Sequence, residues 1–338
     1  MKNKVLNYFL LLSVTGLVLF FSLKDNYEEI ISILKTLNKG WLLIGFLLIL
    51  SYWFFKAIAL KVIAKKFKKD FRFRKAFRYI LEINFFNAIT PFASGGQPFQ
   101  IYSLRKEKIK MADCTTIVIQ QFVVYQIALV LLGIIAIICN HFFHFFPNNS
   151  VLKHLVTIGF IVNALVTVAL FLLAFTRKIN KFIVNKGISL LHRFKIVKDK
   201  ESLTLKFNKY INELYDGTKL LLKNKGEFIG MIFINFAGLV CLYLVPLAIL
   251  YSTGDYTSFN GLESIVASAY VMLIGSFVPI PGGTGGLEYG FVQFYGNFIK
   301  GSILTAIMIT WRFITYYIPL ILGAIVVNIK KKEKKIWE

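Results

Sequence analysis

Long apolar runs alternate with short, strongly basic connections along almost the whole chain. A helix that crosses a lipid bilayer needs roughly 20 apolar residues. Six runs approach or exceed that length: Val5–Leu23, Trp41–Leu60, Thr115–Cys139, Val151–Phe175, Phe228–Leu250 and Ile303–Val327. Two further apolar segments, Tyr79–Leu104 and Glu263–Ile299, are interrupted by clusters of proline and glycine. The pattern predicts an all-α integral membrane protein in which these two segments do not continue as single helices.

The distribution of positive charge predicts the path of the first interrupted segment. Five stretches hold 33 of the 40 Lys and Arg residues: 1–4, 61–78, 105–110, 177–225 and 330–338. Loops rich in Lys and Arg stay on the cytoplasmic side of a membrane. Because two of these stretches flank Tyr79–Leu104, we expect that segment to enter from the cytoplasm, turn at Pro91–Pro98 and return.

Counting membrane crossings predicts a second hairpin near the C-terminus. The loop Tyr251–Leu262 has no Lys or Arg and is expected outside, whereas the basic tail is expected inside. A hairpin over Glu263–Ile299 that enters from outside and turns at Pro279–Gly286, followed by one full span, gives the odd number of crossings required. The expected fold has about six full transmembrane helices and two re-entrant hairpins, with both termini cytoplasmic. Its two span–hairpin–span triplets run in opposite directions, as in an inverted repeat.

A single membrane domain is expected over residues 1–338, with a first half at 1–175 and a second half at 227–338. The connector 176–226 carries apolar residues at helical spacing opposite Lys and Arg. This pattern predicts two amphipathic helices on the inner leaflet, although a plain basic connector that fixes orientation is an equally good interpretation. The connector is shorter than a usual independent domain, so no soluble catalytic domain is expected.

Composition narrows the possible partners. A net charge of +23 is typical of nucleic-acid binding, but the mean hydropathy of +0.64 indicates basic loops beside anionic lipid instead. We therefore expect no nucleic acid partner. Cys114, Cys139 and Cys241 lack metal or redox spacing, and His141 and His144 have no carboxylate or cysteine beside them. Neither a metal nor a cofactor is expected.

The two hairpin turns carry the candidate site. Tip one is Thr90–Pro98 and tip two is Pro279–Gly286. Proline ends a helix and glycine permits positive φ, so a second half-helix is expected to begin near Gln97 in one hairpin and near Leu287 in the other. Such helix N-termini favour anions, including a lipid phosphate. Tight glycine turns that only allow close helix packing are the alternative interpretation.

Two charged residues accompany tip two. Glu288 falls in the first turn after the tip, and Arg312 lies inside the last expected span. An ionisable residue at that depth is costly and marks a functional site by default, so we expect the two to pair. Either an anionic headgroup or a proton competes for Arg312, which makes the pair a switch, or the pair is a buried structural one.

Polar residues accompany tip one. Asn84 and Asn87 share a helical face that approaches the tip and are expected to hydrogen-bond its broken backbone. Glu82, nearer the membrane surface, is expected to pair with a neighbouring Lys or Arg. No catalytic residue is expected, and the candidate lipid-binding and translocation residues are Glu288, Arg312, Gly282, Gly283, Gly285, Gly286, Pro281, Gly95, Gly96, Gln97, Gln100, Asn84 and Asn87.

These motifs resemble a known family. The run from Pro279 to Glu288, followed by Arg312 and Pro319, is similar to the Pro-Gly-Gly-x-Gly-x-x-Glu element and later Arg of the flippase-like transmembrane domain of lysylphosphatidylglycerol synthases. That domain occurs in multiple peptide resistance factors and as stand-alone membrane proteins. Tip one is similar to the family's Pro…Gly-Glu-x-x-Arg element, but Gln97 replaces its Glu and Gln100 its Arg. The form of tip one looks like that of a Gram-positive subgroup.

The resemblance implies a function in lipid transport. It implies translocation of an anionic or lysylated phospholipid, such as lysyl-phosphatidylglycerol, across a bacterial plasma membrane. The alternative is the membrane part of a phosphatidylglycerol lysyltransferase, with catalysis supplied by a soluble partner and a contribution to resistance against cationic antimicrobial peptides. A membrane scaffold that transports nothing is a third interpretation. Catalysis by this chain itself is not expected, although family members carry the enzyme's name.

Overall fold

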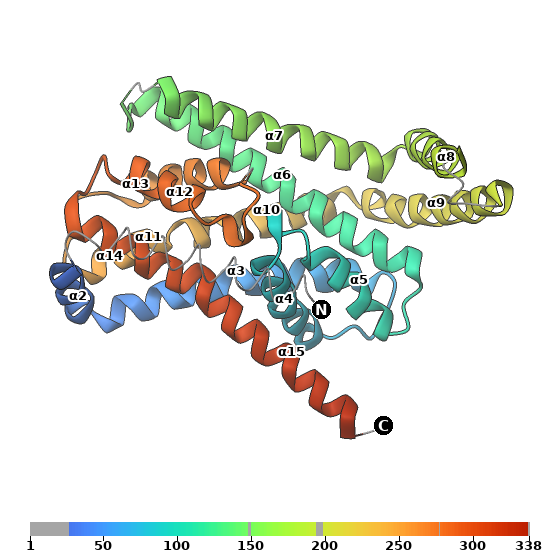
Figure 1. The fold of residues 1–338 in the computed structure, drawn as a ribbon, viewed down its shortest axis with the longest axis horizontal. Helices are drawn as coiled ribbons and strands as arrows, with labels where there is room; N and C mark the ends of the chain where they lie inside the picture. Colours follow the sequence, from blue (N-terminus) through green and yellow to red (C-terminus); the bar gives the residue numbers. More distant parts are fainter. Residues whose placement is uncertain (1–26, 148–149, 194–198, 277, 337–338) are drawn as a thin grey trace.

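A computed structural model of the chain describes residues 27–147, 150–193, 199–276 and 278–336, which form helices and turns without a strand (Figure 1). The expected first span, Val5–Leu23, lies outside the described residues. Within them, five stretches are long and apolar enough to cross a membrane: Lys39–Lys65, Met111–Phe143, Val151–Leu172, Lys225–Ser252 and Gly301–Ile329. They coincide with the other five expected spans, so the all-α, multi-pass membrane class is confirmed.

Two of these spans are not continuous α-helices. The span at 225–252 breaks near Pro246, which lacks the N–H that would continue the helix. The last span contains a π-helical turn immediately after Arg312. The helices that build the spans are α3 (Lys39–Lys65), α6 (Met111–Phe143), α7 (Ser150–Phe175), α10 (Lys225–Tyr243), α11 (Val245–Ser252), α14 (Gly301–Arg312), the π-turn η3 (Phe313–Tyr317) and α15 (Ile318–Ile336). A short helix, α2 (Tyr27–Thr36), precedes them.

Both interrupted segments form helical hairpins, as predicted. The first consists of α4 (Phe73–Ala88), a short turn η1 (Pro91–Ala93) and α5 (Gly96–Lys106). The second consists of α12 (Gly261–Gly275), η2 (Pro281–Gly283) and α13 (Gly286–Tyr295). Each second half-helix begins one residue before the expected position, because a glycine opens it.

The two halves pack as an inverted repeat requires. Helix α3 of the first triplet lies against α10 of the second, and Gly238 permits their close approach, since a Cβ there would lie 3.2 Å from Phe55 Cβ. Helix α6, the last span of the first triplet, lies against α12 of the second hairpin. In the same way α15, in the last span of the second triplet, lies against α4 of the first hairpin (Figure 1). Each hairpin therefore packs on a long span of the opposite triplet.

The connector forms the two expected helices, α8 (Arg177–Arg193) and α9 (Lys200–Lys223). Helix α9, however, lies against α6. Ile211 and Leu214 are buried, and the Tyr210 hydroxyl donates to Thr115 Oγ1 at 2.6 Å. Part of this apolar face is therefore buried by α6, whereas Phe207 of the same face is exposed and its contact with lipid stays a prediction.

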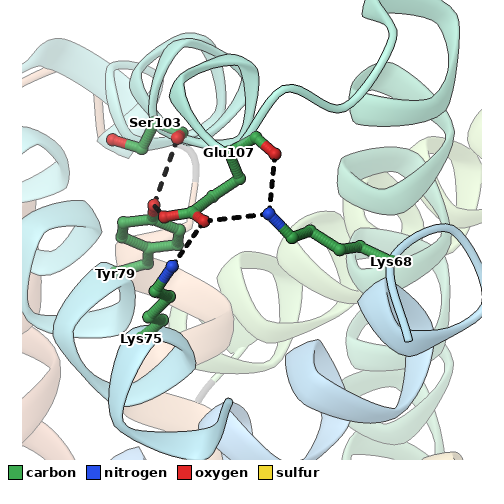
Figure 2. A network of polar contacts seen from close by, with 5 residues as sticks. All are labelled: Lys68, Lys75, Tyr79, Ser103 and Glu107. Atoms are coloured by element: carbon green, nitrogen blue, oxygen red, sulfur yellow. Dashed lines mark hydrogen bonds and ion pairs between the residues drawn. The ribbon is translucent and has the colours of Figure 1, made fainter. Parts of the chain in front are cut away.

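A polar cluster ties the end of hairpin one to the loop before it (Figure 2). The Glu107 carboxylate accepts hydrogen bonds from Lys75 at 2.6 Å and from the Tyr79 hydroxyl at 2.8 Å. Lys68 lies 3.4 Å from the same carboxylate and donates to the Glu107 carbonyl at 2.9 Å. The cluster fixes both ends of hairpin one at the same side of the molecule, as the charge argument requires.

Candidate functional site

The two tips begin with the same backbone turn and then differ, because Ser94 and Gly95 stay in the right-handed helical region whereas Thr284 is extended and Gly285 has positive φ. In each, a proline begins a short turn and the next two residues have positive φ: Phe92 and Ala93 in tip one, at 53° and 50°, and Gly282 and Gly283 in tip two, at 68° and 62°. A serine or threonine and two glycines follow in both. The tips also contact each other. The predicted convergence of the two broken segments is confirmed.

Tip two is held by an acid–base pair. The Arg312 guanidinium lies 2.7 Å from Glu288 Oε1, and both side chains are buried, with 7% and 8% of their surface exposed. The other carboxylate oxygen of Glu288 accepts the Gly285 N–H at 2.7 Å, so Glu288 also caps the start of α13. The pairing predicted from the sequence is confirmed; whether it binds lipid is a separate proposal.

Arg312 also binds the broken backbone of tip two. Its Nη2 donates to the Gly282 carbonyl at 3.1 Å and to Thr284 Oγ1 at 3.3 Å. The guanidinium carbon lies 4.6 Å from the centre of the Tyr316 ring, at the distance of a cation–π contact. One cation therefore joins the last span, the acid and the irregular turn.

Tyr316 links this group to the other hairpin. Its hydroxyl donates to the carbonyl of Ala88, the last residue of α4, at 3.1 Å. The π-turn that follows Arg312 includes Tyr316. Such single-turn insertions often occur at functional sites because they re-aim side chains. Neither the turn nor the roles of Thr284 and Tyr316 follow from the sequence pattern, since neither residue is charged or a helix breaker.

In tip one, neutral side chains accept hydrogen bonds from the broken backbone. Asn87 Oδ1 accepts the Gly96 N–H at 2.9 Å, and Thr90 Oγ1 accepts the Gly95 N–H at 2.9 Å. Asn87 therefore bonds the broken backbone as expected. Asn84 does not do so with its amide nitrogen, which is buried without a hydrogen-bond partner in the described part of the chain.

The two glutamines in the first turns of α5 have different surroundings. Gln100 is buried and its amide donates to Gln121 on α6 at 2.5 Å. This contact joins the second half-helix of hairpin one to the following span, as Glu288–Arg312 does in hairpin two, but without charge. Gln97 Oε1 is buried and has no hydrogen-bond partner among the described residues. The charged site thus belongs to one half of the repeat only.

Glu82 is paired, but deep in the protein. Its side chain is fully buried, with Arg78 Nε at 3.4 Å and the Ser103 hydroxyl donating at 3.1 Å. The expected Lys or Arg partner is confirmed. Helix α5 covers this face of α4, so protein and not solvent surrounds the carboxylate, and its depth in the membrane stays a prediction.

The fold and the site together define a multi-pass helical membrane protein in which two facing helical hairpins meet and a buried ion pair, Glu288–Arg312, holds the second of them. The chain belongs to the family described as the lysylphosphatidylglycerol synthase TM region, whose model matches residues 8–323. The resemblance noted from the tip motifs is thereby confirmed.

Two archaeal relatives are similar over nearly their full length. A UPF0104 membrane protein of Archaeoglobus fulgidus is 25% identical over 334 residues, which cover 94% of this chain and 95% of that protein. A UPF0104 membrane protein of Methanocaldococcus jannaschii is 26% identical over 351 residues, which cover 98% of each. Their names state a membrane protein and no substrate.

Proposed function

We propose that this protein translocates an anionic or lysylated phospholipid, such as lysyl-phosphatidylglycerol, across the membrane, with Arg312 binding the lipid phosphate. The observation that carries the proposal is the bonding of Arg312 to both Glu288 and the tip-two backbone. A phosphate that replaces Glu288 on the guanidinium would also free the carboxylate that caps α13. Ligand binding would then be coupled directly to the conformation of the broken helix.

The chemistry of the pair suits such an exchange. Guanidinium groups bind phosphate as they bind carboxylate, through two parallel charge-assisted hydrogen bonds. An arginine left alone at membrane depth is strongly unfavourable, so Arg312 must always have an anion. We infer that Glu288 holds it between transport events and that lipid phosphate holds it during them.

The exposure of tip one supports access of water or headgroups to this region. The Phe92 side chain is 60% exposed, and the neighbouring residues from Pro91 to Ser94 are exposed as well. Gly285, whose N–H bonds Glu288, is also exposed. Irregular backbone at membrane depth is tolerated only where protein buries it or where it lines a polar cavity. The exposure of tip one favours the second case for that tip, whereas in tip two Pro281 and Thr284 are buried by protein.

The orientation we propose follows from charge. The basic loops at 61–78, 105–110 and 177–225 would face the cytoplasm of a bacterial cell, with both termini on the same side. Tip one would then be reached from the cytoplasmic side and tip two from outside.

A second candidate is the membrane part of a phosphatidylglycerol lysyltransferase whose catalytic domain is a separate polypeptide. The feature that favours it is the basic hairpin of α8 and α9, which could dock a soluble partner. Co-purification of a lysyl-tRNA-dependent lysyltransferase activity with the full chain, lost when the basic residues of α8 are replaced, would support this candidate.

Reconstitution in liposomes with a leaflet-resolved lipid assay tests the leading proposal. We expect transbilayer movement of lysyl-phosphatidylglycerol or phosphatidylglycerol by the wild type, and a fall of at least about tenfold for Glu288→Gln and Arg312→Ala, equivalent to about 1.4 kcal/mol. Glu227→Gln is the matched control, because its partner Lys66 lies 3.2 Å away in an ion pair remote from the tips. Unchanged rates in both site variants would remove the proposed site, and no movement by the wild type would favour the lysyltransferase candidate.

A further inference from the structure

A groove of about 360 Å³ lies between α4 and α15, at the ends of these helices that are farthest from the tips. Its apolar lining includes Phe73, Phe77, Leu81 and Ile329, and two arginines, Arg74 and Arg78, supply its charge. Pockets that bind small ligands start at about this volume. Arg312 precedes Ile329 by 17 residues in the sequence, or about 25 Å along a helix. The groove is therefore separate from the ion pair at the tips.

The packing of α4 on α15 explains why a groove opens here. At Gly323 the two helices are in direct contact, since a Cβ would lie 2.5 Å from the Leu81 carbonyl oxygen and 2.7 Å from Phe85 Cβ. Towards its C-terminal end, α15 leaves the body of the molecule (Figure 1). Larger side chains at Val326 and Ile329 face α4 across the widening gap.

The charge of the groove is positive. Arg74 and Arg78 are one helical turn apart on the same face of α4, and Arg74 is exposed. Arg78 is partly balanced by Glu82, at 3.4 Å. Glu82 also receives the Ser103 hydroxyl from the opposite side. Two guanidinium groups against one carboxylate leave an excess positive charge at the end of an apolar wall.

We propose that this groove binds an anionic phospholipid from the leaflet on the side of the basic loops. The apolar wall formed with α15 matches an acyl chain, and Arg74 together with Arg78 matches a headgroup phosphate. The groove lies next to the loop that carries Lys68 and next to Lys75 in the first turn of α4, so its arginines lie at headgroup depth if that loop is at the membrane surface. Binding here requires no transport by the tips and goes beyond the function proposed above.

Lipid retention by the purified full chain tests the proposal. The protein in neutral detergent is titrated with phosphatidylglycerol or with phosphatidylcholine of the same acyl chains, and bound lipid is counted by native mass spectrometry. We expect phosphatidylglycerol to be retained and Arg74→Gln to weaken its binding by about tenfold, since a lost charge-assisted hydrogen bond has this order of effect. Val326→Trp, which fills the groove without changing charge, should weaken it similarly. Soluble glycerol phosphate should not compete.

Two controls make the outcome decisive. Arg72→Gln removes an exposed charge at the start of the same helix but outside the groove lining, and should leave retention unchanged. Glu227→Gln, in an ion pair outside both the groove and the tips, should also retain the lipid. Melting temperatures identify variants that fail to fold. Arg74 is preferred to Arg78 because loss of Arg78 would leave its partner Glu82 as a buried carboxylate without that cation. Unchanged retention in Arg74→Gln and Val326→Trp, or an equal loss in Arg72→Gln, would overturn the proposal.

Discussion

At the scale of single residues, tip two has no spare room at Gly282. Its φ is +68°, and a Cβ there would lie 2.2 Å from Cε2 of Tyr316. The Gly282 carbonyl also accepts a hydrogen bond from Arg312. Glycine is required here for two independent reasons, its backbone conformation and the ring that packs on it.

Replacing Gly282 by alanine should therefore destabilise more than the same change at Gly285. Gly285 also has a positive φ, +89°, but open space where a Cβ would be. Both changes incur backbone strain of about 1 kcal/mol, and Gly282→Ala adds overpacking against Tyr316 of about 2 kcal/mol. Thermal unfolding in detergent should show a clearly lower melting temperature for Gly282→Ala. Equal melting temperatures would mean that Tyr316 moves aside freely.

A second prediction concerns the stability of the Glu288–Arg312 pair. Glu288→Gln leaves a buried, uncompensated guanidinium and should destabilise the protein by about 3–5 kcal/mol. The double variant Glu288→Gln/Arg312→Met removes both charges and should regain most of that stability. If the pair acts in transport, the double variant remains inactive in the liposome assay although it is stable. A stable and fully active double variant would show that the pair is structural only.

At the scale of elements, Glu107 at the end of α5 joins the two helices of hairpin one through its contacts with α4 (Figure 2). Partial burial by itself would raise the pKa of the Glu107 carboxyl. Hydrogen bonds from Lys75 and Tyr79 and the charges of Lys75 and Lys68 outweigh that effect, so the pKa lies below its ordinary value of 4.5. The depressed pKa means that the ionised carboxylate stabilises the folded hairpin.

The pH dependence of this cluster follows from the sign of the shift. A carboxyl whose folded-state pKa is depressed contributes stability above its ordinary pKa, and that stability is lost as pH falls through the lowered value. Wild-type protein should therefore lose stability relative to Glu107→Gln as the pH is lowered from about 6 to about 3. Melting temperatures of the two proteins across this range measure the difference. A difference independent of pH would show that the ionised form has no role.

Sequence patterns predicted the two hairpin turns but not the π-turn in the last span. Proline and glycine clusters predicted both turns and placed the second half-helices within one residue of their observed starts. The π-turn at 313–317 was not predicted, because Phe-Ile-Thr-Tyr-Tyr is as apolar and as helical in period as its neighbours. A change from α to π geometry depends on what the turn packs against, here the contact between Tyr316 and Ala88.

At the scale of the whole molecule, the basic loops predict that both ends of hairpin one lie on one side of the membrane. Accessibility to membrane-impermeant thiol reagents tests this arrangement in a background without Cys114, Cys139 and Cys241. Lys69→Cys and Lys108→Cys should react from the same side, and Tyr256→Cys from the opposite side. All three positions are exposed in the structure. Reaction of Lys69→Cys and Lys108→Cys from opposite sides would make Tyr79–Leu104 a full crossing and remove the re-entrant architecture.

The sequence by itself determined the membrane class, the five described spans, the two hairpins and the pairing of Glu288 with Arg312. These follow from hydropathy over about 20 residues, from helix breakers and from the cost of lone charges in lipid, all of which are local properties of the chain.

Only the tertiary structure decided which neighbours complete each element. It set α9 against α6, placed Glu82 in the interior and brought Tyr316 between Gly282 and Ala88. It also gave positive φ to the two residues after the proline in both tips, although these are Phe92 and Ala93 in one and two glycines in the other. Such contacts join residues far apart in the chain, and the geometry of packing that selects them has no signature in a local pattern.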